Sequence, residues 1–265
     1  LTPAEAGRQM AVWNKEKVNL FAGFDFTFDV NLGANDNGGD GIVFVLQNQG
    51  VNAAALPGRE LGYEGLNYSL GIEIDTRKDG GTKELTCDHI TINTDGDLED
   101  VLAGPVQAGV GCNIEDGNNH TLRVVWNGTA KFLEVFFDGQ PRLSLTTDLV
   151  ADFFRGNPEV HWGFTAATGD IPNRQTVCAR KLEITCDCTP FTPIVRPTGH
   201  FDICEGDAIT FVTQPGYRKY LWNTGDTTQN LTVRTAGQYY VTVQQGSGCG
   251  GNSEVSTVVV NPRPT

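Results

Sequence analysis

The sequence has little positive charge. Its 265 residues include 19 Lys and Arg but 32 Asp and Glu, which gives a formal net charge of −13 at pH 7. Such a chain repels the phosphates of nucleic acids and of anionic lipids, whereas it attracts divalent cations. We therefore expect no nucleic-acid partner, and we expect metal binding only where acidic residues come together.

Long apolar runs are also absent. No stretch approaches the roughly 18 apolar residues of a membrane-spanning helix, so we expect no membrane insertion by this chain. The chain has no basic start followed by an apolar segment, so we expect a piece of a longer protein whose signal peptide has been removed. Helix-favouring runs are nearly absent, whereas 32 Gly and 12 Pro favour an all-β chain with many turns.

The seven cysteines show no paired spacing of the zinc-binding type. Cys186 and Cys188 lack two further clustered ligands, so we expect disulfides in an oxidising compartment, and hence an extracellular or cell-surface location. The odd count leaves one thiol free or bonded outside this chain. The expected bonds, in order of preference, are Cys204 with Cys249, Cys87 with Cys112, and Cys178 with Cys186 or Cys188.

Alternation of apolar and polar residues dominates the first two thirds of the chain. From Phe24 to Val30 every second residue is apolar, which is typical of a strand with one buried face. Turn-forming Gly, Asn and Asp residues separate further segments of this kind, over residues 42–46, 90–93, 122–126, 133–137 and 160–164. A short helix is predicted over 148–154, with Asp148 as its N-cap and Gly156 beyond its end.

A change of composition divides the chain after residue 188. Residues 189–199 contain three prolines and no alternation, which predicts an extended linker between a domain over 1–188 and a second one. Residues 200–265 alternate again in short strands, so they predict a small sandwich. Its expected core consists of Ile209, Phe211, Tyr220, Trp222, Leu231, Val233, residues 239–243 and residues 255–259.

The densest group of polar residues lies between positions 73 and 89. Glu73 and Asp75 share one face of an apolar strand, because residues two apart point to the same side. Asp79 is followed by a glycine-rich turn, and Asp88 and His89 begin the next strand. If the chain folds back as a hairpin at this turn, these residues come close to Glu73 and Asp75. Oxygen ligands on loops suit calcium, whereas an added imidazole admits manganese or zinc. Because buried carboxylates without cations are costly, this segment predicts a metal site.

Two glycine-rich loops carry further candidate binding residues. Asp40 is bracketed by glycines at the start of the apolar strand 42–46, where its carboxylate can be exposed while a ligand approaches the backbone. The loop of residues 56–66 contains Gly62 and Tyr63. Taken alone, either loop indicates no more than a turn.

Taken in order, these segments resemble the L-type (legume-lectin-like) lectins, especially those of bacterial surface adhesins, over residues 8 to 185. The matching stretches are 39–44, 62–65, 72–76 with 88–90, 120–126, 135–139 and 162–169. The first two resemble sugar-binding loops, and the third resembles the metal-binding strand pair of the family. The last, Trp-Gly-Phe-Thr-Ala-Ala-Thr-Gly, is the most specific match and leads into a fourth loop at 170–173.

The resemblance implies a concanavalin A-like jelly-roll sandwich that binds glycans with the help of calcium and is not an enzyme. The expected sugar ligands are Asp40, which follows a cis peptide bond in the family, the Gly62 backbone, Tyr63, Asp79, Asp170 and Ile171. The expected calcium ligands are Asp75, the Arg77 carbonyl, Asp79, and either Glu84 or Asp88. Whether Glu73 and His89 hold a second metal such as manganese stays open, although we do not expect it.

Three features depart from the pattern of the family. The last acidic calcium ligand is ambiguous between Glu84 and Asp88. Arg77 stands where many members carry an aromatic residue that stacks on the sugar, so stacking is lost or shifts to Tyr63. Asp79 replaces the usual Asn and adds a negative charge that still suits calcium.

Residues 200–265 resemble the bacterial immunoglobulin-like repeats of large surface adhesins, on the stretches 204–207, 220–225, 237–243 and 248–249. Such repeats usually act as spacers. The expected whole is therefore the lectin module of a secreted or cell-surface adhesin, attached to an immunoglobulin-like spacer. The identity of the glycan or polysaccharide and the oligomeric state are not readable from the sequence.

Two other functions fit parts of the pattern. A glycoside hydrolase of the same jelly-roll architecture carries two Glu residues on one strand, as Glu-x-Asp-x-Glu or Glu-x-Asp-x-x-Glu. Glu73 and Asp75 begin this pattern, but Arg77 and Lys78 occupy both possible positions of the second Glu, which argues against hydrolysis. The other alternative is a structural calcium-binding adhesion module without a sugar site, against which the order of Asp40 and Gly62 argues.

Overall fold

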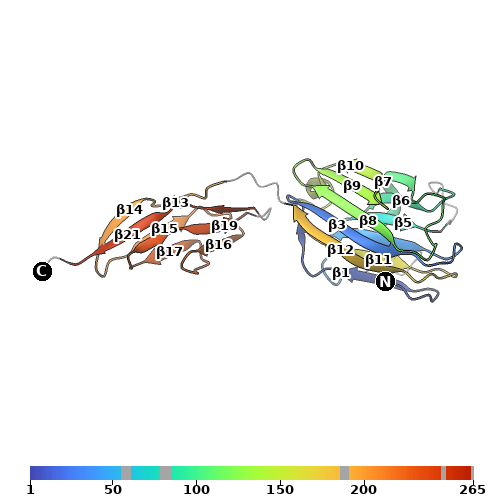
Figure 1. The fold of residues 1–265 in the computed structure, drawn as a ribbon, viewed down its shortest axis with the longest axis horizontal. Coiled ribbons are helices and arrows are strands. Elements are labelled where there is room, and N and C mark those ends of the chain that lie inside the picture. The colour runs from blue at the N-terminus through green and yellow to red at the C-terminus, as the bar shows by residue number, and fades with distance from the viewer. Residues whose placement is uncertain (55–60, 78–84, 186–190, 246–248, 264–265) are drawn as a thin grey trace. The chain divides into compact units, whose positions relative to one another are not determined.

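The computed structural model describes residues 1–54, 61–77, 85–185, 191–245 and 249–263. Within these residues the regular elements are β-strands and one short helix, and the chain forms two compact units, Leu1–Thr185 and Cys186–Thr265 (Figure 1). This confirms the all-β class. No helix in the described part of the chain has the length and apolar character needed to cross a membrane.

The first unit contains two antiparallel sheets. The larger has the order β1-β11-β4-β5-β6-β7, with β2 also paired with β11. Its strands are β1 (Gln9–Trp13), β2 (Val18–Asn19), β4 (Gly41–Gln47), β5 (Ser69–Asp75), β6 (His89–Thr94), β7 (Asp97–Gln107) and β11 (Glu159–Ala167). The smaller has the order β10-β9-β8-β3-β12. Its strands are β3 (Gly23–Asn31), β8 (His120–Asn127), β9 (Phe132–Phe137), β10 (Gln140–Thr146) and β12 (Thr176–Thr185).

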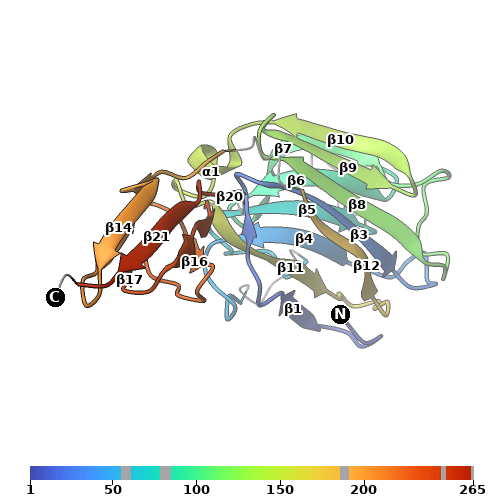
Figure 2. The ribbon, with the colours of Figure 1, turned by 60° about the vertical axis from the view of Figure 1, so that its left-hand side comes forward.

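The core of the first unit lies between these two sheets (Figure 2). Along β3 every second side chain of residues 24–30 is buried in this core, as the alternation predicts. Phe26 meets Trp162 of β11 with ring centroids 4.8 Å apart, and Phe28 meets Phe164 at the same separation. Because β3 and β11 belong to different sheets, these aromatic contacts hold the two faces together.

The expected helix is present but shorter than predicted. Helix α1 spans Leu149–Asp152, and the Asp148 side chain accepts a hydrogen bond from the Ala151 N–H at 3.2 Å, as an N-cap should. Leu149 and Val150 are its buried residues.

The second unit consists of three small sheets, with the orders β13-β15-β17, β14-β21-β18 and β16-β19-β20. Its strands are β13 (Val195–Arg196), β14 (His200–Cys204), β15 (Ile209–Thr213), β16 (Lys219–Trp222), β17 (Asn230–Val233), β18 (Gly237–Tyr239), β19 (Val241–Gln244), β20 (Gly250–Asn252) and β21 (Ser256–Asn261). Most of the predicted core positions form one cluster around Phe211 and Trp222, but Tyr240 is 37% exposed and Val255 is 50% exposed.

Part of the expected linker belongs to the second unit. Val195 is buried in the core of this unit, and β13 pairs with β15. Phe191 stacks on Tyr217 with centroids 6.0 Å apart. Apolar residues between the prolines therefore anchor residues 191–199, and the extended conformation that the prolines favour is used as an edge strand.

The cysteine pairing differs from the expectation in two of three bonds. Cys87 and Cys112 form the predicted disulfide. Cys204 carries a free thiol although Cys249 is disulfide-bonded, so the predicted bond between them is wrong. Cys178 is also free and exposed, so its predicted bond is wrong as well; its possible partners, residues 186 and 188, lie outside the described residues. Disulfides indicate an oxidising compartment.

Candidate functional site

Three segments meet where neighbouring strands of the larger sheet begin or end. The register places Gly41, the first residue of β4, opposite Asp75 at the end of β5 and opposite Ala167 at the end of β11. The loop that precedes β4 is therefore adjacent to residues 76–77 and to residues 168–173. These segments contain many of the residues that were predicted to bind a ligand.

Asp40 is fixed at this junction by its backbone. Its N–H donates to the Ala167 carbonyl at 3.1 Å. Its carbonyl accepts hydrogen bonds from the backbone N–H of Thr76 at 3.0 Å and from the Thr76 hydroxyl at 3.1 Å. The Gly39–Asp40 peptide bond is cis, as the resemblance implies. With the backbone engaged on both sides, the side chain of Asp40 is the part that can meet a ligand.

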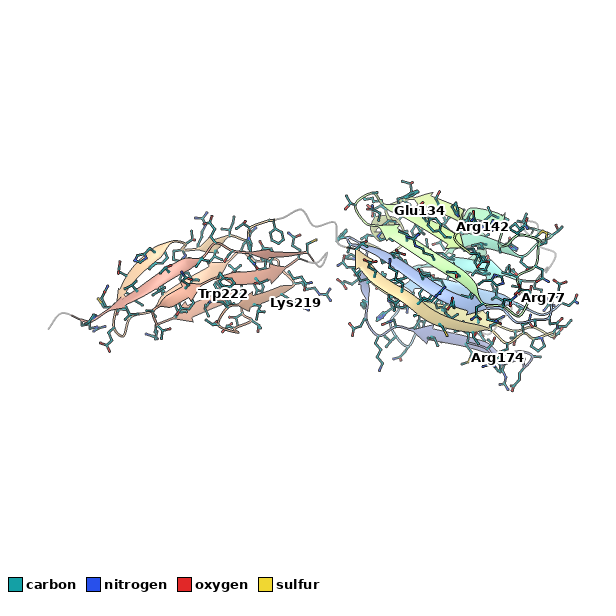
Figure 3. The ribbon with its side chains drawn as sticks, viewed as in Figure 1. Arg77, Glu134, Arg142, Arg174, Lys219 and Trp222 are labelled. Atoms are coloured by element: carbon teal, nitrogen blue, oxygen red, sulfur yellow. A yellow bond between two sulfur atoms is a disulfide. The ribbon has the colours of Figure 1, made fainter. Side chains whose placement is uncertain are left out.

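The Asp40 carboxylate forms an ion pair with Arg77, whose Nη1 donates to Oδ1 at 3.1 Å. The Asp40 side chain is 6% exposed and the Arg77 side chain is 32% exposed. A Cβ on Gly169 would lie 2.1 Å from Nη1 of Arg77 and 2.8 Å from Oδ1 of Asp40, so a larger residue there would displace this pair. Arg77 lies at the loop end of the unit (Figure 3), and a ligand that reaches Asp40 meets the guanidinium too.

The loop after β11 is tied to the loop before β4. The Gly39 N–H donates to the Ile171 carbonyl at 2.9 Å. The buried Asn173 amide donates to the Asn35 carbonyl at 2.9 Å, and its Oδ1 accepts the Asn35 N–H at 3.3 Å. Asp170 is exposed, and Ile171 is 48% exposed, so both are open to a ligand. Asn173 was expected only as the end of the fourth loop, and its positioning role has no local signal because its partner is 138 positions away.

Gly62 and Tyr63 are both buried. A Cβ on Gly62 would lie 3.0 Å from the Ala166 carbonyl, so Gly62 packs against β11 close to the residue that binds the Asp40 backbone. Tyr63 is fully buried, its hydroxyl accepts a hydrogen bond from the Ser69 hydroxyl at 2.9 Å, and burial raises its pKa. A buried ring cannot stack on a ligand at the surface, so the structure removes Tyr63 from the expected sugar ligands.

Glu73, Asp75 and His89 form a cluster on the face of β5 and β6 that points away from the main core. Asp75 lies opposite His89 in the register, and one ligand atom from each of the three residues lies within 4.8 Å of the others. The Glu73 carboxylate accepts hydrogen bonds from the Thr91 hydroxyl and, at 2.8 Å, from the Asn93 amide, which fixes its position. Two carboxylates and an imidazole fit a divalent ion, and the imidazole favours manganese or zinc over calcium.

The expected calcium ligands are only partly within the described residues. Asp79 and Glu84 lie outside them. The Asp75 Oδ1 accepts the Arg77 N–H at 2.6 Å, so the backbone of Arg77 stays close to the Asp75 carboxylate. Oxygen from this carboxylate and this backbone is the donor type that calcium prefers.

Asp88 points away from that cluster. It precedes His89, and successive residues of a strand face opposite sides of a sheet. Its Oδ2 accepts the Ile114 N–H at 2.7 Å, and Ile114 belongs to the main core. Glu115 is buried beside the Asp88 carboxylate. A Glu in an irregular loop carries no pattern that signals its burial.

Residues 1–181, more than half of the chain, match the family described as the legume lectin beta-barrel domain. The chain belongs to this family. Lectin domains of this family are typically not enzymes.

Three solved structures, among others, share the fold. The exoplasmic/lumenal domain of VIP36, in a form bound to Ca²⁺ and Man3GlcNAc, is 19% identical, with 73% of this chain and 82% of that chain covered and a TM-score of 0.53. For the metal-free lectin I-B4 of Griffonia simplicifolia, the identity is 20%, the coverage 68% and 82%, and the TM-score 0.54. The lectin of Bauhinia forficata in complex with GalNAc is 21% identical, with 70% of this chain and 86% of that chain covered and a TM-score of 0.51.

Proposed function

We propose that this legume lectin chain is a calcium-dependent glycan-binding module of a secreted or cell-surface adhesin. The first domain, residues 1–188, binds the glycan, and residues 200–265 form an immunoglobulin-like spacer. The observation that carries the proposal is the Asp40 carboxylate, which is held at the junction of three segments and paired with Arg77.

The chemistry of this junction suits sugar hydroxyls. A carboxylate accepts hydrogen bonds from two neighbouring hydroxyls, and such charge-assisted bonds are about twice as strong as neutral ones. Arg77 adds N–H donors at the same point, in place of the aromatic residue that other members carry. Asp170 and Ile171 border the site on its exposed side. The Gly62 N–H and the Asp79 carboxylate complete the proposed set of sugar ligands.

Calcium is held by Asp75, the Arg77 carbonyl, Asp79 and Glu84 in this proposal. Because the Asp88 carboxylate is engaged by Ile114 on the other face of the sheet, we assign the last acidic position to Glu84 rather than to Asp88. When bound, calcium supplies a fixed positive charge beside the sugar site. Asp75 and the Arg77 backbone hold the segment after β5 next to Asp40, and a bound form of VIP36 that contains both Ca²⁺ and a glycan supports this pairing of ligands.

Hydrolysis is the weaker alternative. The Glu73 carboxylate is buried and held by Thr91 and Asn93, so it is not presented to a substrate. The Arg77 guanidinium, at one of the two positions where the architecture would need a second Glu, contacts Asp40 instead. Release of reducing ends from a glucan or galactan panel that is abolished in Glu73→Gln would favour the hydrolase.

The decisive variant is Asp40→Asn, compared with wild type on a glycan array with calcium and with a chelator. The substitution keeps the shape but removes the charge of Asp40. Since hydrogen bonds to charged groups contribute roughly 1.5–3 kcal/mol each, the affinity for the selected glycan should fall roughly 10-fold to 100-fold. The chelator should abolish binding by the wild type.

Asp97→Asn is the matched control. It removes one charge from the same sheet, but Asp97 lies beside Thr94, at the end of β6 away from His89. Its glycan binding should equal that of wild type. Wild-type affinity in Asp40→Asn would place the sugar site elsewhere in the chain, and binding that persists in chelator would remove the calcium dependence.

A further inference from the structure

The two faces of the β5–β6 pair carry different acidic groups. Ile74 of β5 and Ile90 of β6 point into the main core. Because residues two apart share a face, Thr76 and Asp88 lie on the same inner face, just beyond the ends of these strands. The Glu73, Asp75 and His89 cluster lies on the outer face. A group that gathers around Asp88 is therefore separated from this cluster by the thickness of the sheet.

A loop brings another carboxyl group to Asp88. The Cys87–Cys112 disulfide ties the loop after β7 to the start of β6. The Asp88 N–H donates to the Cys112 carbonyl at 3.3 Å, and its Oδ2 accepts the Ile114 N–H at 2.7 Å. These bonds carry Glu115 to the inner face, where its carboxyl group lies beside the Asp88 carboxyl group and the Thr76 hydroxyl.

Glu115 has no partner that accounts for its burial. It is 2% exposed, and both of its carboxylate oxygens are buried without a hydrogen-bond partner. A buried carboxylate needs a hydrogen-bond donor, a cation or a proton. Of the two neighbours of this carboxyl group, Asp88 is itself acidic, and the Thr76 hydroxyl donates its hydrogen to the Asp40 carbonyl.

We propose that Glu115 and Asp88, with the Thr76 hydroxyl, form a second divalent-cation site on the inner face of the sheet, separate from the calcium site of the sugar loops. Two carboxylates and a hydroxyl are hard oxygen donors, the ligand type that calcium takes. The remaining positions of a calcium ion that takes 6–8 oxygens fall to water and backbone carbonyls. This site goes beyond the proposed sugar binding and does not depend on it.

The electrostatics of Glu115 agree with this site. Burial and the adjoining Asp88 carboxylate raise the pKa of Glu115 to about 9. A cation or a proton beside the carboxyl group would offset this cost of burying its charge. A proton shared with Asp88 is the rival arrangement, and it requires no metal.

The position of the site links it to the sugar loop. The Thr76 hydroxyl donates to the Asp40 carbonyl at 3.1 Å, so a cation at Glu115 is one residue removed from the backbone of Asp40. Calcium at the inner face would therefore stabilise the position of the loop before β4 through the hydrogen bond between Thr76 and Asp40.

The test counts calcium bound per chain by equilibrium dialysis, with the outer site disabled by Asp75→Asn. This variant should still bind one calcium ion, and Asp75→Asn/Glu115→Gln should bind it at least roughly tenfold more weakly, because calcium affinity depends on the charge of the ligands. Asp75→Asn/Asp116→Asn is the matched control, since Asp116 is exposed in the same loop, and it should keep the ion.

Gln matches the shape of a protonated Glu, so Glu115→Gln should fold, and circular dichroism checks this. If the double variant nevertheless fails to fold, Glu115→Gln alone should bind one calcium ion fewer than wild type. Equal calcium binding with and without Glu115, or none in Asp75→Asn, overturns the proposal in favour of the shared proton. Glycan binding is not read in this experiment, so the failure of the sugar site leaves its outcome unaffected.

Discussion

The two units of the chain bury different kinds of side chain. In its described part, the first unit buries seven ionisable residues of the Asp, Glu and His types, namely Asp25, Asp40, Glu73, Asp88, His89, Glu115 and His161. In the described part of the second unit, no Asp, Glu, Lys, Arg or His is buried, and the buried polar residues are Thr213, Ser253 and Ser256. Because burial of a charge is costly, the first unit must pair these groups internally or bind ions and ligands, whereas the second has nothing comparable to satisfy.

The buried ionisable residues indicate that the functional site lies in the first unit. The core of the second unit consists mainly of aromatic and β-branched residues, as expected of a structural spacer. In the first unit most of the buried ionisable groups lie near the end of the sheet where Gly41, Asp75 and Ala167 meet, although Asp25 lies on the other sheet and His161 lies at the opposite end of β11. The comparison predicts that the two units respond to different substitutions.

The largest expected effect is that of Trp222→Ala in the second unit. Trp222 is 1% exposed, lies inside this unit (Figure 3), and its Nε1–H donates to the Thr228 carbonyl at 2.9 Å. Replacing a buried Trp by Ala costs about 3–5 kcal/mol, a large share of the stability of so small a unit. In calorimetry, the transition of the second unit should disappear or move far down, while the transition of the first unit and the glycan binding stay unchanged.

Leu221→Ala is the control for this prediction. Leu221 is the neighbour of Trp222 on β16, but it points outward and is 52% exposed. Its replacement should change the stability by less than about 1 kcal/mol. Glycan binding that is lost in Trp222→Ala would show that the second unit contributes to the site, and the comparison between the units would fail.

The next effect in size is that of the Cys87–Cys112 disulfide in the first unit. The bond closes a loop with a sequence separation of 25 residues, for which chain entropy predicts a stabilisation of about 3 kcal/mol. The variant Cys87→Ala/Cys112→Ala should therefore lower the melting temperature of the first unit alone. Cys178→Ala, at an exposed free thiol, is the control and should leave it unchanged. A shift confined to the second unit would contradict the assignment of this bond.

The sequence predicts those parts of the fold that depend on local pattern. Alternation in residues 24–30 identifies β3 because one face of the strand is buried and the other is not. Asp148 marks the start of α1 because an N-cap acts over three residues. The glycine-bracketed Asp40 likewise marks a loop at the start of a buried strand.

The remaining features depend on contacts between distant residues. Glu115 is buried because a disulfide and the Asp88 carboxylate fix its loop, and no local pattern encodes either cause. Tyr63 in a glycine-rich loop appears available to a ligand until Ser69 and the sheet are seen to cover it. Cys204 and Cys249 sit at plausible places in the sequence, but position along the chain does not fix which sulfurs come together.

The smallest expected effect concerns Asp25, a buried charge of the first unit that serves structure alone. Its Oδ1 accepts the Arg123 Nε–H at 2.8 Å, and its Oδ2 accepts hydrogen bonds from Arg123 at 3.0 Å and from Lys181 at 2.7 Å. Hydrogen bonds from Arg123 and then Lys181 hold the pKa of Asp25 below its usual value. Asp25 thus has the internal partners that Glu115 lacks.

Asp25→Asn should destabilise the first unit by about 1 kcal/mol at pH 7, a modest amount because the Arg123 side chain is 42% exposed and water screens the pair. A lowered folded-state pKa contributes stability above the unfolded value of about 3.9, and this stability is lost as the pH falls through the folded value. The gap between wild type and Asp25→Asn in urea unfolding should therefore be constant from pH 7 to 5 and close below pH 4. Asp29→Asn, on the same face of β3 but 29% exposed and 3.3 Å from Arg180, should show a smaller gap. A gap for Asp25→Asn that widens toward low pH would mean that the carboxylate is held by its burial rather than by its cations.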